Sequence, residues 1–201
     1  MNRVLTIVIG ALILLALATL VLVAIPYHEL KAQLPPEKLK PYTLAQLRGR
    51  STYVNLGCVY CHSQQPRAPA LGPDALRGWG RAPVPADYAY DYPHLLGVSR
   101  TGPDLFNIGA RQPSIDWHLT HLFQPRAVSP GSVMPSYPFL FRVVAQPGPN
   151  DKVVALPPQF EPSQGKVIAT QEALDLVDYL KSLNHTYALS DSDTGTPGAS
   201  Q

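Results

Sequence analysis

The sequence contains little charge and little sulfur. Acidic and basic residues make up 15% of the 201 residues, and the formal net charge is +2. So mild a charge does not favour a nucleic-acid partner. Only two cysteines and two methionines occur, and one methionine is the initiator. Chemistry that depends on sulfur is therefore confined to Cys58, Cys61 and Met134.

Both cysteines belong to one motif, Cys58-Val59-Tyr60-Cys61-His62. Two cysteines separated by two residues and followed directly by a histidine are the attachment signature of a c-type haem. On a helical turn the two thiols share a face, so both can form thioethers to one porphyrin edge. His62 is then carried beneath the ring as an axial ligand of the iron. The motif predicts one covalently bound haem c.

Two other kinds of site use cysteines at this spacing. A dithiol redox motif would be expected in a βαβ setting, which this chain lacks. A zinc site could recruit His118 and His121 as a second ligand pair. Neither reading explains a histidine directly after the second cysteine.

The scarcity of methionine predicts the second axial ligand. Met134 is the only internal thioether, and it lies in the proline-stiffened tract 132–138, far downstream of the haem motif. Ligation by one histidine and one methionine is typical of cytochromes c. A second histidine is the alternative, namely His94, His118 or His121. Lone histidines are more often structural, so the sequence favours His62 and Met134 as the axial ligands of the haem iron.

A long apolar run lies near the amino terminus. Residues 4–25 carry no charge. As a helix they would span about 33 Å, enough for the bilayer core. A cleaved signal peptide would have a shorter apolar region, and no A-x-A site is visible before Pro26. The run predicts an uncleaved transmembrane anchor.

The orientation of this anchor rests on two opposing arguments. Only Arg3 precedes the run, whereas Lys31, Lys38 and Lys40 follow it, so charge alone would place the body in the cytoplasm. Long domains can translocate regardless of charge, however. Attachment of c-type haem takes place on the outer side of the bacterial membrane. We therefore expect a single-pass protein of the bacterial inner membrane with its C-terminal domain in the periplasm.

The remaining composition suggests one proline-rich domain. About 175 residues follow the anchor, enough for a domain with its own core. The 22 prolines are about twice the usual share and gather in residues 66–93 and 125–162. These stretches predict long irregular loops around a small helical core. The expected divisions are a cytoplasmic end (1–3), the anchor (4–25), a linker (26–40), the periplasmic mono-haem cytochrome c domain (41–187) and a disordered polar tail (188–201).

Three helices are expected in this domain. The first begins near Thr43, with Gln46 completing a capping box, and leads into Cys58. Its predicted apolar face consists of Leu44, Leu47, Ser51 and Val54. The second runs from Pro113 to just before Pro125, and the third begins after Thr170. Their predicted inward faces are Ile115, Leu119 and Leu122 in the second helix, and Leu174, Val177, Leu180 and Leu183 in the third.

Together with the haem motif, these helices resemble the class I cytochrome c fold, which is mostly α. In that family the first and last helices cross through a glycine and aromatic residues. Gly49, Tyr53 and Tyr179 stand at fitting positions.

The same resemblance implies an environment for the haem. The carbonyl group of Pro103 is expected to accept a hydrogen bond from Nδ1 of His62, which would make Nε2 the better ligand. Leu105 is expected to press on the ring, and Arg111 to reach a propionate.

A closer resemblance follows seven tracts in order: 40–43 (KPYT), 57–64 (GCVYCHSQ), 100–105 (RTGPDL), 116–118 (DWH), 121–122 (HL), 125–126 (PR) and 134–138 (MPSYP). They are similar to the FixO-like subunit II, the mono-haem subunit of cbb3-type cytochrome c oxidases. The resemblance covers about half of the chain, plus the anchor.

This resemblance implies a cytochrome subunit with no reaction of its own. It would accept electrons from another c-type cytochrome subunit and pass them to the haem–copper catalytic subunit, which reduces oxygen. Two alternatives remain open: a free membrane-tethered cytochrome that shuttles electrons, or the cytochrome subunit of a complex similar to nitric-oxide reductase.

Overall fold

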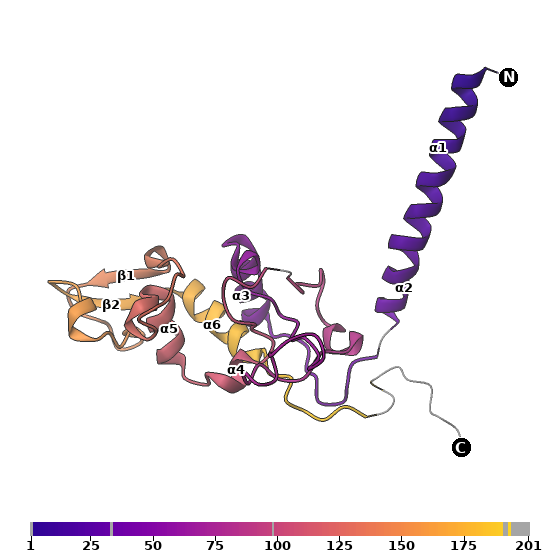
Figure 1. The fold of residues 1–201 in the computed structure, drawn as a ribbon. Coiled ribbons are helices and arrows are strands. Elements are labelled where there is room, and N and C mark those ends of the chain that lie inside the picture. The colour runs from indigo at the N-terminus through magenta and orange to yellow at the C-terminus, as the bar shows by residue number, and fades with distance from the viewer. Residues whose placement is uncertain (1, 33, 98, 191–192, 194–201) are drawn as a thin grey trace. The chain divides into compact units, whose positions relative to one another are not determined.

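A computed structural model of the chain describes residues 2–32, 34–97, 99–190 and 193. The fold is mostly helical with a small sheet, so the predicted mostly α class with an N-terminal apolar helix is confirmed (Figure 1). The chain divides into two compact units. The first comprises Met1–Leu39, Val84–Asp91 and Ala188–Gln201, and the second comprises Lys40–Pro83 and Tyr92–Tyr187. Most of the tail expected at 188–201 lies outside the described residues.

The first unit begins with a long helix that changes its winding near Pro26. It consists of α1 (Arg3–Thr19), a π-helical turn (Leu20–Ala24) and α2 (Ile25–Lys31). Proline has no N–H to donate to the carbonyl group four residues earlier, so a regular α-helix is interrupted there. The N–H of Ile25 donates instead to the carbonyl oxygen of Leu20, which is the wider π spacing.

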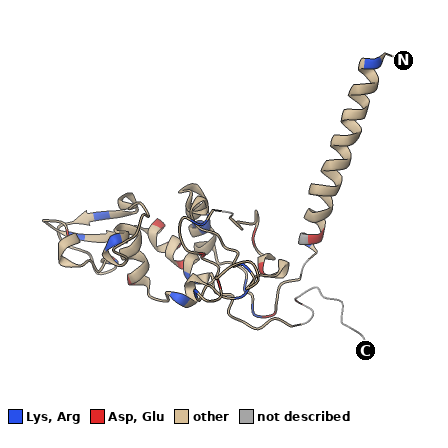
Figure 2. Cartoon of the chain, viewed as in Figure 1, with Lys and Arg blue, Asp and Glu red and all other residues tan. Residues whose placement is uncertain are grey.

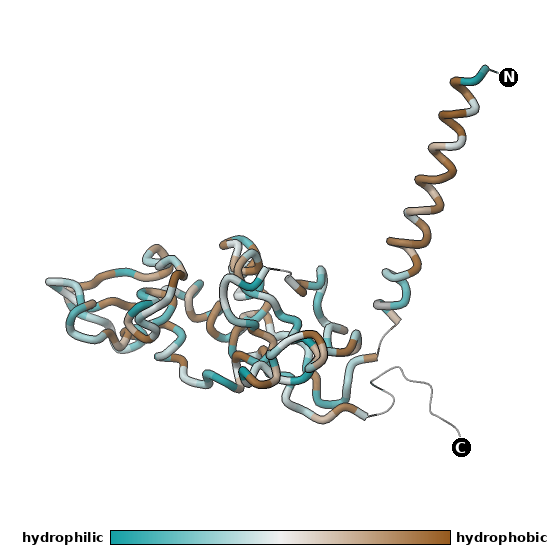
Figure 3. The backbone as a smooth tube through the Cα atoms, viewed as in Figure 1, coloured by the Kyte–Doolittle hydropathy of each residue, from teal (hydrophilic) through white to brown (hydrophobic). Residues whose placement is uncertain are grey.

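This helix is long and apolar enough to cross a membrane. The apolar stretch Arg3–Glu29 contains 27 residues, and its most apolar part buries no residue within the described structure. Figure 3 shows hydrophobic colour along most of its length, and Figure 2 shows charged residues only near its two ends. An apolar helix of this length and position fits a single-pass membrane anchor.

The second unit is built on the crossing of α3 (Leu44–Asn55) and α6 (Gln171–Ser182) (Figure 1). Thr43 caps α3 and forms the predicted capping box with Gln46. At the crossing, a Cβ atom on Gly49 would overlap the backbone oxygen of Asp175, so only glycine permits this approach. The buried rings of Tyr53 and Tyr179 lie 5.6 Å apart. The expected helix crossing is therefore present.

The predicted apolar face of the first helix is wrong. All four of its residues are exposed, namely Leu44, Leu47, Ser51 and Val54. The buried face instead carries Gly49, Arg50, Thr52 and Tyr53. Gly49 does not contribute to a pattern of apolar side chains, but it determines which face of α3 the helix α6 can approach. Arg50 tolerates burial because its guanidinium group donates to the carbonyl oxygens of Tyr92 and Pro93.

The two shorter helices complete the helical core. α5 (Ile115–Phe123) begins two residues later than predicted, because the side chain of Ser114 caps it by accepting from the N–H of Trp117. Leu119 and Leu122 are buried as predicted, whereas Ile115 is 41% exposed. α4 (Ile108–Arg111) packs closely on the end of α6. In α6 the predicted inward residues Val177, Leu180 and Leu183 are buried, and Leu174 is half-buried.

A small antiparallel sheet was not predicted. β1 (Phe141–Val144) pairs with β2 (Lys166–Ala169), so that Phe141 lies opposite Ala169. Thr170, the cap of α6, donates from both its N–H and its hydroxyl group to the carbonyl oxygen of Leu140. The sheet therefore connects the segment after Met134 to the start of α6. The 3₁₀ turns are Cys58–Tyr60, Pro85–Tyr88, Pro125–Ala127, Pro138–Leu140 and Pro158–Phe160.

Candidate functional site

A cavity of about 460 Å³ lies in the second unit. This volume is within the range typical of ligand and cofactor sites. Its walls include all the site residues expected from the sequence, namely Cys58, Cys61, His62, Pro103, Leu105, Arg111 and Met134. They come from the turn after α3, the loop before α4, α4 itself and the loop after α5. The fold thus brings together residues that are up to 76 positions apart (134 − 58).

The cysteine motif is presented by a tight turn at the end of α3. Gly57 adopts φ 72°, a left-handed conformation that favours glycine, and the chain then enters a 3₁₀ turn. The N–H groups of Cys61 and His62 both donate to the carbonyl oxygen of Cys58, at 3.1 and 3.0 Å. This turn places both free thiols and the imidazole of His62 on the wall of the cavity.

The surroundings of Cys58 argue against a dithiol redox centre. Burial raises the pKa of its thiol to about 11. A reactive dithiol needs the opposite, because the thiolate is the nucleophile and its pKa is lowered at redox-active sites.

The His62 ring is held by backbone atoms of the facing loop. Its Nδ1 lies 2.7 Å from the carbonyl oxygen of Pro103, the acceptor that the resemblance implies. A Cβ atom on Gly102 would overlap the imidazole, so glycine leaves room for the ring. Burial lowers the pKa of His62, which favours the neutral form. A neutral ring that donates from Nδ1 to Pro103 keeps the lone pair of Nε2 for a metal.

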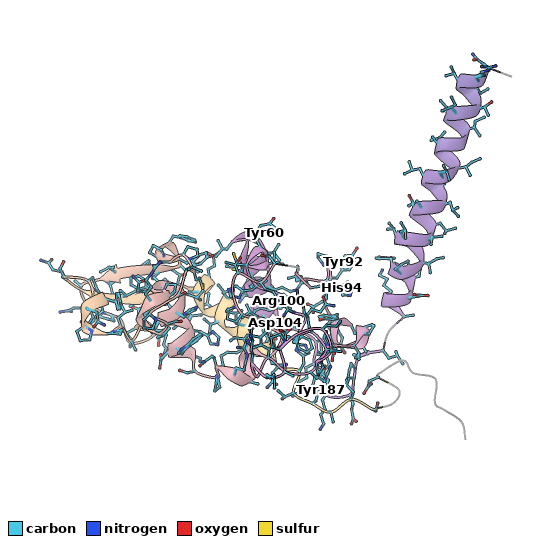
Figure 4. The ribbon with its side chains drawn as sticks, in the orientation of Figure 1. Tyr60, Tyr92, His94, Arg100, Asp104 and Tyr187 are labelled. Carbon is cyan, nitrogen blue, oxygen red and sulfur yellow. The ribbon has the colours of Figure 1, made fainter. Side chains whose placement is uncertain are left out.

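Asp104 fixes the loop that supports His62. Its buried carboxylate accepts from the hydroxyl group of Ser63 at 2.6 Å and from the N–H groups of Gln65 and Phe106 at 2.7 and 2.8 Å. Burial raises the pKa of Asp104, and these hydrogen bonds oppose the rise. Figure 4 labels Asp104 beside Arg100, and the positive charge of Arg100 also opposes this rise in pKa. In the sequence Asp104 stands out only as part of the tract 100–105, and no local pattern indicates this role.

The cavity wall also carries Met134 and two histidines. Met134 is half-buried, and its N–H donates to the hydroxyl group of Ser132 at 3.2 Å. His118 and His121 of α5 also line the cavity, whereas His94 does not do so in the described part of the chain. Nε2 of His118 lies 2.8 Å from the carbonyl oxygen of Gln112. The structure therefore brings Met134 and two of its three possible rivals to the same space.

The zinc alternative gains no support from the arrangement. Within the described residues, no group of three or more His, Cys, Asp or Glu side chains is placed to hold a metal ion. A structural zinc site would need four such ligands in tetrahedral geometry.

The chemistry of the cavity wall fits a haem. Most of the wall is apolar, but Nε of Arg111 and Nδ1 of His121 are buried and make no hydrogen bond within the described residues. Arg111 also donates to the carbonyl oxygen of Asp104, which fixes its guanidinium group. A haem c has an apolar ring, two carboxylates that can accept hydrogen bonds and an iron that takes nitrogen and sulfur ligands. Cys58, Cys61, His62 and Met134 supply the donor set that such a group requires.

Comparison with known protein families gives one result for this chain. The family model of FixO, described as the mono-haem subunit of cytochrome c oxidase, matches residues 1–156. The matched region includes the apolar helix, the cysteine motif, the loop before α4, α5 and Met134. A comparison with curated proteins finds no match.

Proposed function

Because the chain belongs to the FixO family, the mono-haem cytochrome subunits of cbb3-type cytochrome c oxidase, we propose that it relays electrons within that oxidase. The proposed donor is another c-type cytochrome subunit, and the proposed acceptor is the haem–copper catalytic subunit. The observation that carries this proposal is the shared cavity of Cys58, Cys61, His62 and Met134. When bound there, haem c supplies one-electron chemistry.

Each residue of the donor set has a proposed role. Cys58 and Cys61 form the two thioethers, so the cofactor is covalently attached. His62 would ligate the iron through Nε2, and Met134 would supply a sulfur ligand. Two protein ligands on the iron would leave no coordination site open for oxygen, which suits electron transfer rather than oxygen chemistry.

Three further residues shape the proposed environment. The carbonyl group of Pro103 orients the His62 ring, since it lies 2.7 Å from Nδ1. Leu105 is 8% exposed and adds to the apolar wall. Arg111 is proposed to hold a propionate, because its Nε is buried and has no hydrogen-bond partner among the described residues, while its Nη2 donates to the carbonyl oxygen of Asp104.

The proposed location is the bacterial inner membrane, with the second unit in the periplasm. The apolar stretch Arg3–Glu29 serves as the anchor. Covalent haem attachment on the outer side of the membrane supports this orientation. A tethered shuttle cytochrome would need the same anchor, but the family match favours a fixed subunit of the oxidase.

Purification of the full-length chain tests the proposed function. A tag after Gln201 allows isolation in a mild detergent. A large haem–copper polypeptide and a second c-type cytochrome are expected to co-purify in fixed ratio. An untagged strain provides the control for non-specific binding. Isolation of the chain alone, with its haem complete, would contradict the subunit role and favour a free shuttle.

A further inference from the structure

His118 and His121 lie one turn apart on α5 but have different surroundings. His118 is 3% exposed, and its Nε2 lies 2.8 Å from the carbonyl oxygen of Gln112. Nδ1 of His121 is buried and has no hydrogen-bond partner within the described residues. The backbone of Pro125 lies near enough to raise the pKa of the His121 ring, but no hydrogen bond of normal geometry forms. Within the described residues, His118 therefore has a hydrogen-bond partner of normal geometry, and Nδ1 of His121 has none.

The His121 ring is fixed on the cavity wall. It stacks on Trp117, with ring centroids 4.7 Å apart and planes 11° apart, and both residues line the cavity. Burial above all lowers the pKa of His121 to about 4, and electrostatic coupling to the nearby His62 and His118 rings acts in the same direction. The ring is therefore neutral near pH 7 and carries one N–H donor and one lone pair.

The occupant of the cavity is the natural source of the missing partner. A buried polar atom without a hydrogen bond destabilises the folded protein, and such atoms are rare in native proteins. Within the described residues, the wall carries three polar atoms of this kind: Nε of Arg111, Nδ1 of His121 and the hydroxyl oxygen of Tyr53. The hydrogen-bonding groups of a haem are its two propionate carboxylates. Iron could also take a nitrogen, but His62 and Met134 occupy both axial positions in the proposed function.

We propose that His121 is a haem-contacting residue that donates a hydrogen bond from Nδ1 to a propionate carboxylate. This assignment rests on the haem of the proposed function but not on the identity of the electron partners. The assignment gives His121 and His118 different roles. His118 packs α5 against the segment that contains Gln112. Trp117 acts as a positioning residue, because its ring holds the imidazole at a fixed angle.

Three substitutions of His121 test the contact in the purified full-length cytochrome. His121→Phe keeps a ring against Trp117 but removes both nitrogens. His121→Asn places an amide donor near the position of Nδ1, whereas His121→Gln places it near that of Nε2. The readouts are the propionate bending band in the resonance Raman spectrum and the reduction potential. Neither requires the partner subunits.

The expected results distinguish the variants. In His121→Phe the propionate band shifts and the potential falls, because a carboxylate that loses its donor is more negative and stabilises ferric iron. His121→Asn stays close to wild type, and His121→Gln behaves like His121→Phe. A structural role alone would not separate the two amides.

Three results would overturn the assignment. One is an unchanged band and potential in His121→Phe. Another is loss of the sixth ligand in that variant, which would make His121 an iron ligand. The third applies if His121→Phe takes up no haem, in which case His121→Asn and His121→Gln are compared with each other. Identical propionate bands in these two variants would contradict the contact. Haem staining of the wild-type chain on a denaturing gel separates the two proposals. If the wild-type chain is stained, a negative result with the variants concerns the role of His121 alone. If the wild-type chain is unstained, the proposed function itself is contradicted.

Discussion

At the residue scale, backbone atoms orient the imidazole ring of His62, the proposed iron ligand. The carbonyl oxygen of Pro103 lies 2.7 Å from Nδ1, and glycine at position 102 leaves room for the ring. The Asp104 carboxylate holds the same loop through three hydrogen bonds. Because these contacts lie within the protein, the His62 ring is oriented independently of the haem, which lowers the cost of ordering a ligand on binding.

Covalent attachment of the haem is proposed to depend on Cys58 and Cys61. Wild-type protein is expected to retain its haem stain after denaturation and gel electrophoresis, because thioethers survive these conditions. The double variant Cys58→Ala, Cys61→Ala should lose the stain. Expression of the polypeptide is followed by immunoblot as the control. A wild-type haem that extracts readily into acidic acetone would contradict a c-type attachment.

Replacement of the proposed distal ligand tests Met134. Met134→His should lower the reduction potential substantially, because an imidazole replaces a thioether. The weak long-wavelength absorbance that reports sulfur–iron bonding should also disappear. His94→Gln serves as the control, since His94 does not line the cavity in the described part of the chain. An unchanged spectrum and potential in Met134→His would assign the ligand position to a histidine.

The sequence predicted residues that the fold brings to one cavity, but not all their neighbours. Motif spacing predicts Cys58, Cys61 and His62 as donors, and the scarcity of methionine predicts Met134. The role of Asp104 and the unsatisfied nitrogen of His121 depend on which backbone groups lie opposite them after folding. No local pattern carries that information.

At the scale of elements, the crossing of α3 and α6 depends on Gly49. Gly49→Ala should destabilise the fold by about 1–3 kcal/mol or more, because the new Cβ atom would overlap the backbone of Asp175, which cannot rotate away. Chemical denaturation of the purified protein measures the change. Gly131→Ala is the matched control, since a Cβ atom there meets nothing within 4 Å. Equal stability of the two variants would contradict the close approach.

Helix ends were predicted better than helix faces. Thr43 with Gln46, and Thr170, are local signals, and both caps are present in the structure. The face of α3 that is buried is the one on which α6 packs. The 3–4 spacing of apolar residues in α3 does not indicate where α6 will pack. The sheet escaped prediction because each strand has only four residues and Phe141 pairs with Ala169, far along the chain.

At the scale of the whole molecule, the orientation of the anchor is open to a direct test. A reporter enzyme that is active only in the periplasm, fused after Gln201, should be active. Mass spectrometry of the mature chain should find residues 4–25 still attached. The same reporter fused to a cytoplasmic protein provides the negative control. An inactive fusion would place the second unit in the cytoplasm, and a chain that begins after Pro26 would indicate a cleaved signal.

The central claim is that a haem held in the cavity of this chain passes electrons to the catalytic subunit of the oxidase. The most direct measurement compares two electron sources in the purified complex: a donor cytochrome c and a small reductant that reaches the catalytic subunit directly. With Cys58→Ala, Cys61→Ala in the assembled complex, oxidation of cytochrome c should be lost while oxygen consumption with the small reductant persists. Undiminished oxidation of cytochrome c by this variant complex would contradict the claim.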